Sequence, residues 1–274
     1  SDFAPARPSW PLRSRQQWRQ PRRESGLLGT SPTWQTDPVI SDRSRALLDG
    51  AHIAPEVLAL VPGYRCLLLV AEGLRPGPSD EASEAILAAA EEQARVELGD
   101  NPPEALPHVE AWRTAYRAFG AKPQRTRPSV DALLRRVGGG LPRINRLADA
   151  YNAVSISAVL PIGGEDLASY AGSPALVRAD GTEPFDTVAA GESVVEHPAP
   201  GEVVWRDDLG VTCRMWNWRQ CRRTLITEST TEALFVLDGL PELGPEGLEA
   251  AGDALAAALG SLSPGAVFAR RVID

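Results

Sequence analysis

The 274 residues are enough for one large or two small domains, and the apolar content of 43% is ordinary for a folded protein. A formal net charge of −8 argues against a dedicated nucleic-acid binder, because affinity for phosphates depends on Lys and Arg. The three cysteines have no repeated metal-ligand spacing, so we expect no metal site and reduced thiols in a cytoplasmic protein. No apolar run approaches the roughly 18 residues of a membrane span, so no membrane partner is expected.

The first 44 residues differ from the rest in composition. Residues 1–44 are rich in Arg, Pro, Ser and Trp and have no helix or strand period. They are interpreted as an extended basic arm, which could contact nucleic acid, or as residues foreign to the native protein. Residues 45–274 are predicted to form a single domain.

Helical signals come first within this domain. An apolar run at 66–70, CLLLV, predicts a strand, whereas an acidic start and an Ala-rich body predict a helix over 79–98. Ser129 is a candidate N-cap for a further helix that ends at a run of three glycines. The predicted helices lie within 45–60, 79–98, 109–119, 129–137, 144–152 and 247–262.

Strand signals dominate the second half of the domain. The predicted strands are 154–160, 175–178, 203–206, 211–216, 224–226 and 233–237. Helices in the first half of the domain sequence and strands in the second half predict an α+β fold rather than an alternating α/β fold with a parallel sheet.

The common catalytic signatures are missing. The sequence has no phosphate loop, no dinucleotide-type glycine fingerprint and no His-Glu-x-x-His. Because His52, His108 and His197 lie far apart in different contexts, a Ser-His-Asp triad has little support and each histidine is interpreted as structural or superficial.

Residues 144–172, INRLADAYNAVSISAVLPIGGEDLASYAG, resemble the tRNA-editing (B3/B4-type) domain of the phenylalanyl-tRNA synthetase β subunit. Bacterial members of that family have Ile-Asn, Val-Asp, an Asn, and then a Pro-Leu-His-Ala-Phe-Asp turn. Their places here are taken by Ile144-Asn145, Ala148-Asp149, Asn152 and residues 161–166. The resemblance extends over residues 45 to 262.

The resemblance implies a three-layer fold with mixed or antiparallel strands flanked by helices. It also implies binding of the 3′ end of an aminoacyl-tRNA and hydrolysis of a mischarged amino-acid ester without a cofactor. The hydrolysis would occur in trans, since no amino-acid-activating half is recognisable. Transient association with a synthetase or with the elongation machinery is a further expectation. Where the family has the motif histidine this chain has Gly163, so a histidine-assisted hydrolysis cannot be transferred to it.

The candidate site residues follow from this motif. Small polar side chains and close backbone approach suit a pocket for an amino acid and the terminal adenosine, which makes Asn152, Gly163, Gly164 and Asp166 the candidate catalytic residues. The predicted substrate-binding residues are Asp149, Ser155, Ser157, Glu202, Asp208, Asn217, Arg219 and Thr227. Between residues 113 and 146 nine basic residues face a single acidic one. The predicted tRNA-binding residues in this segment are Arg125, Arg127, Arg135, Arg136 and Arg143.

Alternatives stay open at this stage. If Trp216 and Trp218 share one strand face, Asn217 and Arg219 point the other way, either to a ligand or to solvent. Ser155 and Ser157 could equally be strand residues that face solvent. For the whole protein, a noncatalytic tRNA or small-molecule binding module and an aminoacyl-tRNA-dependent biosynthetic transferase compete with the deacylase.

Overall fold

A four-stranded antiparallel sheet is the central layer of the structure. A computed structural model describes residues 39–274, and these residues fall in one structural unit. The sheet has the order β11-β2-β10-β3, and its bounds are β2 Arg65–Glu72, β3 Ile162–Asp166, β10 Glu232–Gly239 and β11 Val267–Ile273. The arm predicted over 1–44 lies outside the described residues as far as residue 38.

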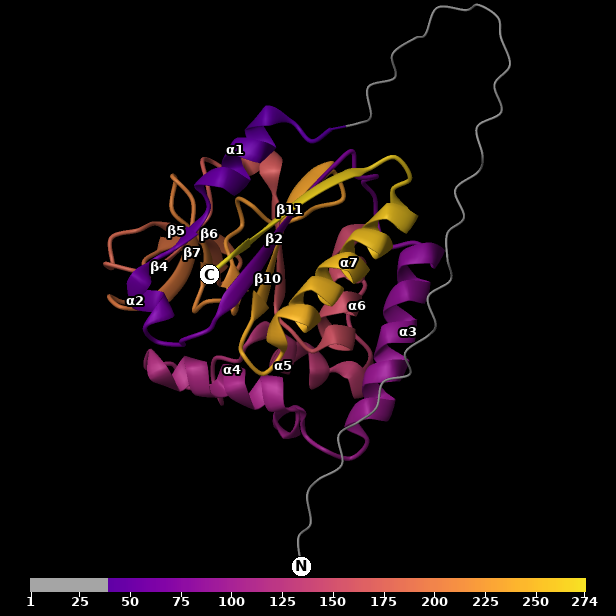
Figure 1. Cartoon of the computed structure of the whole chain (residues 1–274), viewed down its shortest axis with the longest axis horizontal. Helices are drawn as coiled ribbons and strands as arrows, with labels where there is room; N and C mark the ends of the chain where they lie inside the picture. Colours follow the sequence, from indigo (N-terminus) through magenta and orange to yellow (C-terminus); the bar gives the residue numbers. More distant parts are fainter. Residues whose placement is uncertain (1–38) are drawn as a thin grey trace, which may run out of the picture. The chain divides into compact units, whose positions relative to one another are not determined.

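Helices cover one face of this sheet. Leu67 and Leu69 of β2 and Phe235 of β10 point to that face and pack against α6 and α7. In Figure 1 the helices α3, α6 and α7 lie together beside the strands β2, β10 and β11. The helix bounds are α3 Glu81–Leu98, α6 Arg146–Ala158 and α7 Gly244–Leu262.

A second sheet covers the opposite face. Cys66 and Leu68 of β2 and Leu234 of β10 pack toward Trp205 and Cys213 of this five-stranded sheet. Its order is β1-β4-β7-β8-β9, with β1 parallel to β4 and the other pairs antiparallel. The strand bounds are β1 His52–Ile53, β4 Ala175–Arg178, β7 Val203–Arg206, β8 Val211–Arg214 and β9 Arg219–Gln220. The predicted α+β class, in three layers with mixed and antiparallel strands, is confirmed.

Further elements surround these layers. In Figure 1, α4 and α5 lie along the lower end of the sheets and α1 lies at the upper end. The remaining bounds are α1 Asp42–Gly50, α2 Pro55–Leu58, α4 Pro107–Ala118, α5 Ser129–Leu134, β5 Phe185–Ala189 and β6 Glu192–Glu196, with short 3₁₀ turns at Pro103–Ala105, Val137–Gly139 and Leu167–Ser169. No helix in this part of the chain has the length and apolarity needed to cross a bilayer.

The strand predicted over 154–160 is wrong, because these residues continue helix α6. Asn145 caps the helix by accepting a hydrogen bond from the Ala148 amide at 2.8 Å, and Val159 ends it in the left-handed conformation with φ 54°. Apolar residues on two sides of α6 enter both hydrophobic cores. The many small residues of α6, such as Ala and Ser, allow close packing of a helix that is buried between layers. A helix buried on two sides does not show the one-sided pattern of apolar residues that is typical of a surface helix.

Three other expectations also differ from the structure. Within residues 161–166, expected as a turn, Ile162–Asp166 form the edge strand β3, whereas in 224–226 only Leu225 pairs, by one bridge to Glu165. Trp216 and Trp218 do not share a strand face, since residues 215–218 are the turn between β8 and β9. Trp216 is fully buried in that turn and Trp218 is 37% exposed.

The two glycines of β3 have different roles in packing. A Cβ on Gly164 would lie 2.5 Å from Ile226 Cδ1 and close to the rings of Tyr151 and Phe235, whereas a Cβ on Gly163 would meet nothing within 4 Å. We expect Gly164→Ala to lower the free energy of unfolding by about 1–3 kcal/mol through overpacking. Gly163→Ala, the matched control, should be neutral or slightly stabilising. Urea unfolding of the two variants tests this, and equal stability would mean that the packing around Gly164 relaxes freely.

Candidate active site

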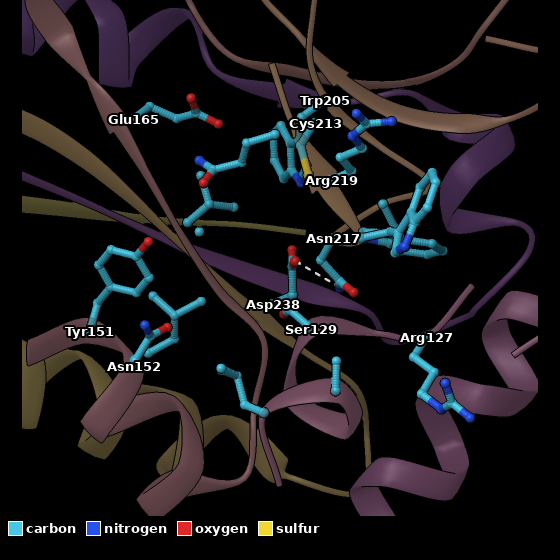
Figure 2. Close-up of a pocket in the computed structure, with 18 of the residues that line it drawn as sticks. Arg127, Ser129, Tyr151, Asn152, Glu165, Trp205, Cys213, Asn217, Arg219 and Asp238 are labelled. Carbon is cyan, nitrogen blue, oxygen red and sulfur yellow. Dashed lines mark hydrogen bonds between the residues drawn. The ribbon is translucent and has the colours of Figure 1, made fainter. Parts of the chain in front are cut away.

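A cavity of about 400 Å³ opens between the two sheets at the edge formed by β3 and β9. Figure 2 shows its walls. One wall is formed by β3 and β10, and the opposite wall is formed by β7, β8 and the turn after β8. Helix α6, helix α5 and the loop that precedes α5 close the remaining sides. The volume falls within the range of small-molecule sites.

Glu165 is the acidic group on the β3 wall. In a strand, residues i and i+2 point to the same face, so Glu165 projects beside the empty space at Gly163. Its side chain is buried, and burial raises the pKa of Glu165 to about 8. The carboxyl group is therefore close to its titration point near neutral pH.

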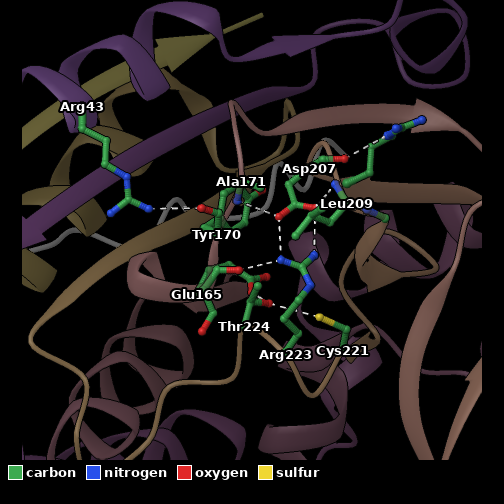
Figure 3. A network of polar contacts seen from close by, with 12 residues as sticks. Arg43, Glu165, Tyr170, Ala171, Asp207, Leu209, Cys221, Arg223 and Thr224 are labelled. Carbon is green, nitrogen blue, oxygen red and sulfur yellow. Dashed lines mark hydrogen bonds and ion pairs between the residues drawn. The ribbon is translucent and has the colours of Figure 1, made fainter.

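The loop after β9 holds Glu165 in place. The Thr224 hydroxyl donates a hydrogen bond to Glu165 and lies 3.2 Å from the Cys221 thiol (Figure 3). Arg223 in the same loop forms an ion pair with Asp207, with two N–O distances of 2.8 Å. Because Arg223 also donates to the Ser169 carbonyl at 2.6 Å, the loop is tied to the segment that follows β3.

Asp238 is the second buried carboxyl group, on the β10 wall. It accepts hydrogen bonds from the Tyr64 hydroxyl at 2.5 Å and from Asn217 Nδ2 at 3.1 Å, while Asn217 Oδ1 accepts from Tyr116 at 2.8 Å. Burial raises the pKa of Asp238 to about 7, and the two donated hydrogen bonds lower it in part. The network links α4, the turn after β8 and β10 behind one end of the cavity.

Two polar side chains of α6 face the opposite end. Asn152 and Tyr151 line the cavity, and within residues 39–274 neither side chain makes a hydrogen bond to the protein. In Figure 2 both lie on the Glu165 side of the cavity, away from Asn217. Tyr151, Asn152 and Glu165 thus form a polar group that is open to a ligand.

Residues 111–244 match the family described as the B3/4 domain. This segment of the chain is thus similar to the B3/4 domain. The residues that line the cavity, from Arg125 to Asp238, all fall inside the matched range. The cavity therefore lies within the segment that has this similarity.

A similar solved structure is an N-terminal fragment of the phenylalanyl-tRNA synthetase β subunit from Pyrococcus horikoshii. The similarity has 12% sequence identity and a TM-score of 0.40, and it covers 81% of this chain and 50% of that one. The chain thus spans about half the length of that fragment. Among curated proteins no sequence matches it.

The fold brings part of the predicted site together. Seven of the predicted site residues line the cavity: Arg125, Arg127, Arg136, Asn152, Gly163, Asn217 and Arg219. Asn152 and Asn217 come from different layers and still face the same space, as the sequence prediction of a shared pocket required.

The carboxylates proposed from the sequence lie elsewhere. Asp149 accepts from Ser83 and the Ile144 amide, Glu202 pairs with Arg214, and Asp166 caps the turn after β3. Asp208 is exposed beside Gly172. Each is accounted for by local structure, as carboxylates in turns commonly are.

The other predicted site residues also lie outside the cavity lining. Ser155 donates to the Leu160 carbonyl at 2.6 Å, Ser157 is half-buried on α6, and Thr227 is exposed and bonds to Ser229. Gly164 points to the opposite face of β3. Arg135 and Arg143 form ion pairs with acidic residues.

The residues that line the cavity but were missed from the sequence include Tyr151, Glu165, Trp205, Trp218, Gln220 and Asp238. Asp238 could have been found from its position directly after the apolar run 233–237, because a carboxylate next to a buried strand requires hydrogen-bond or ion-pair partners. Glu165 had no comparable signal, because residues 161–166 were expected to be a turn. In the described part of the chain no three His, Cys, Asp or Glu residues are placed to hold a metal ion.

Tyr64→Phe tests the network around Asp238. Removing the hydroxyl leaves the buried carboxyl group with one fewer donor, which should lower the free energy of unfolding by about 1–3 kcal/mol. The loss should be larger at pH 8 than at pH 5, because the charged form needs the donor more. Urea unfolding at both pH values measures it, and a loss that does not depend on pH would contradict the titration of Asp238.

Asp238→Asn gives the complementary pH test. With a folded pKa raised from 3.8 to about 7, the native state holds its proton after the unfolded chain has released it. The stabilisation from Asp238 is then complete below about pH 4 and is lost as the pH rises through about 7. The variant should show a smaller fall in stability between pH 4 and 7 than the parent does.

Proposed function

We propose that this protein hydrolyses the ester bond of a mischarged aminoacyl-tRNA in trans. The observation that carries the proposal is the placement of Glu165, a buried carboxyl group that titrates near neutral pH, beside the unfilled space at Gly163. The resemblance of the 144–172 motif to synthetase editing domains supplies the class of substrate. The cavity could hold an amino acid and the terminal ribose.

Glu165 acts as the general base in this proposal. Its carboxylate removes a proton from a water molecule in the space beside Gly163, and the oxygen of that water attacks the ester carbonyl carbon. The bond from that carbon to the ribose oxygen then breaks, and the protonated Glu165 returns the proton to the leaving ribose oxygen. The products are the free amino acid and tRNA with a free terminal hydroxyl.

Asn152 orients the ester in this scheme. Its amide has no partner in the part of the chain that the structure describes, so it can donate a hydrogen bond to the carbonyl oxygen as negative charge develops there. An ester requires less assistance than an amide, because an alkoxide is the better leaving group. A base together with one oriented donor therefore suffices without the histidine of the family motif.

A panel of deliberately mischarged tRNAs tests the activity as a whole. Release of free amino acid from one or more members supports the deacylase. Transfer of the aminoacyl group to an added amine would instead establish a transferase, and the absence of both reactions across the full panel would leave a binding module.

The pH profile of hydrolysis tests the base. After subtraction of the uncatalysed reaction, the rate should rise with pH as Glu165 loses its proton and level off above about pH 8. Glu165→Gln should lower turnover by about 10²- to 10⁴-fold and remove this rise. Asp166→Asn is the matched control, since Asp166 caps a turn and should leave the profile unchanged. The same rise in Glu165→Gln would exclude Glu165 as the base.

Gly163→Val tests the reaction space. The added side chain would project into the cavity without a clash with the protein, so the fold should persist while hydrolysis is lost. Single-turnover hydrolysis and thermal unfolding are measured on Gly163→Ala and Gly163→Val together. Parental rates for both variants would show that the reaction takes place elsewhere.

A further inference from the structure

The basic segment between residues 113 and 146 divides into two structural classes. Five of its arginines form ion pairs with acidic residues: Arg113, Arg117, Arg135, Arg143 and Arg146. Arg125, Arg127 and Arg136 form no ion pair and no side-chain hydrogen bond within residues 39–274, and all three line the cavity. The unpaired arginines are thus gathered at one place.

Two orphaned donors lie on the same wall. Arg127 Nε and Ser129 Oγ are buried and have no hydrogen-bond partner among the described residues. Native structures satisfy nearly all buried polar groups, so unpaired donors beside a cavity indicate an acceptor that the ligand brings. Because the guanidinium groups of Arg125, Arg127 and Arg136 line the same wall, that acceptor is an anion, and phosphate is an anion that arginine binds with bidentate geometry.

An exposed indole completes the site. Trp218 lines the same cavity and is 37% exposed, whereas the neighbouring Trp216 is fully buried. The turn that separates them contains two consecutive non-glycine residues with positive φ, Met215 at 46° and Trp216 at 67°. Such backbone is strained and persists where the surroundings enforce it, commonly at functional sites. The result here is one indole in the core and one at the cavity.

We propose that Arg125, Arg127, Arg136 and Trp218 bind the single-stranded 3′ end of the RNA, with the arginines on its last phosphodiesters and a base stacked on the indole. The proposal rests on the proposed function for the identity of the RNA and extends it to how that RNA is held. Exposed aromatic side chains beside arginines are the usual means of binding unpaired nucleotides. Ion pairing removes Arg135 and Arg143 from this role.

Binding of uncharged RNA tests the proposal separately from hydrolysis. The probe is a fluorescent RNA minihelix with a single-stranded 3′ tail ending in CCA, compared by anisotropy with the same minihelix cut blunt. The triple variant Arg125→Gln, Arg127→Gln, Arg136→Gln should weaken binding of the tailed probe at least tenfold. It should also reduce the slope of log affinity against log salt by about 2, at about 0.7 for each phosphate contact.

A matched triple variant controls for net charge. Arg95, Arg117 and Arg270 form exposed ion pairs away from the cavity, so their replacement by Gln makes the same charge change at little cost in stability. This control should bind the tailed probe like the parent. Equal loss in both triples, or equal affinity for tailed and blunt probes, would overturn the proposal.

Trp218 has its own test. Trp218→Ala should weaken binding of the tailed probe about 5- to 150-fold, the usual range for loss of one stacked base, and Trp218→Phe should restore part of it. Unchanged affinity in Trp218→Ala would remove the stacking role. Tail-dependent binding without hydrolysis of any mischarged tRNA would refute the deacylase and leave this site standing.

Discussion

Strand β10 is buried on both faces, and this constraint determines the chemistry of the cavity. One face packs on α6 and α7 and the other faces the second sheet, so Glu165 on the neighbouring strand β3 and Asp238 on β10 are removed from water. Charge is costly in such a place, which is why Glu165 and Asp238 hold protons to unusually high pH. A surface carboxylate at pKa 4 would be a weaker base at neutral pH than Glu165, so the burial that stabilises the fold also gives Glu165 the basicity that the proposed reaction requires.

The two ends of the cavity differ in how completely the protein satisfies their polar groups. Asp238 is held by Tyr64 and Asn217, so it belongs to a finished internal network. At the other end the Asn152 side chain has no hydrogen-bond partner between residues 39 and 274, and on the α5 side Arg127 Nε and Ser129 Oγ are buried donors without acceptors in the same range. Unsatisfied buried groups raise the free energy of the protein until a ligand supplies their partners. We therefore propose that the substrate binds against these groups.

Arginine content alone was a poor guide to nucleic-acid binding in this acidic protein. The structure separates arginines that neutralise buried or neighbouring acids, such as Arg113 on Asp131, from those that have no acid to neutralise. Both kinds occur within one segment and look alike in the sequence. The ion pairs formed in the fold distinguish them, because a guanidinium group already bound to a carboxylate has few donors left for a phosphate.

The sequence by itself determined the α+β class, most element positions and the motif around Asn152 and Gly163, because hydrophobic period, glycine placement and family motifs are local properties. It misassigned 154–160, since a helix buried between two cores loses the one-sided period that marks helices, and it could not show that residues 215–218 turn. Only the tertiary structure decided which carboxylates face the cavity. Glu165 and Asp238 are buried and hydrogen-bonded by strands and loops that lie far apart in the chain, and no local sequence pattern predicts those contacts.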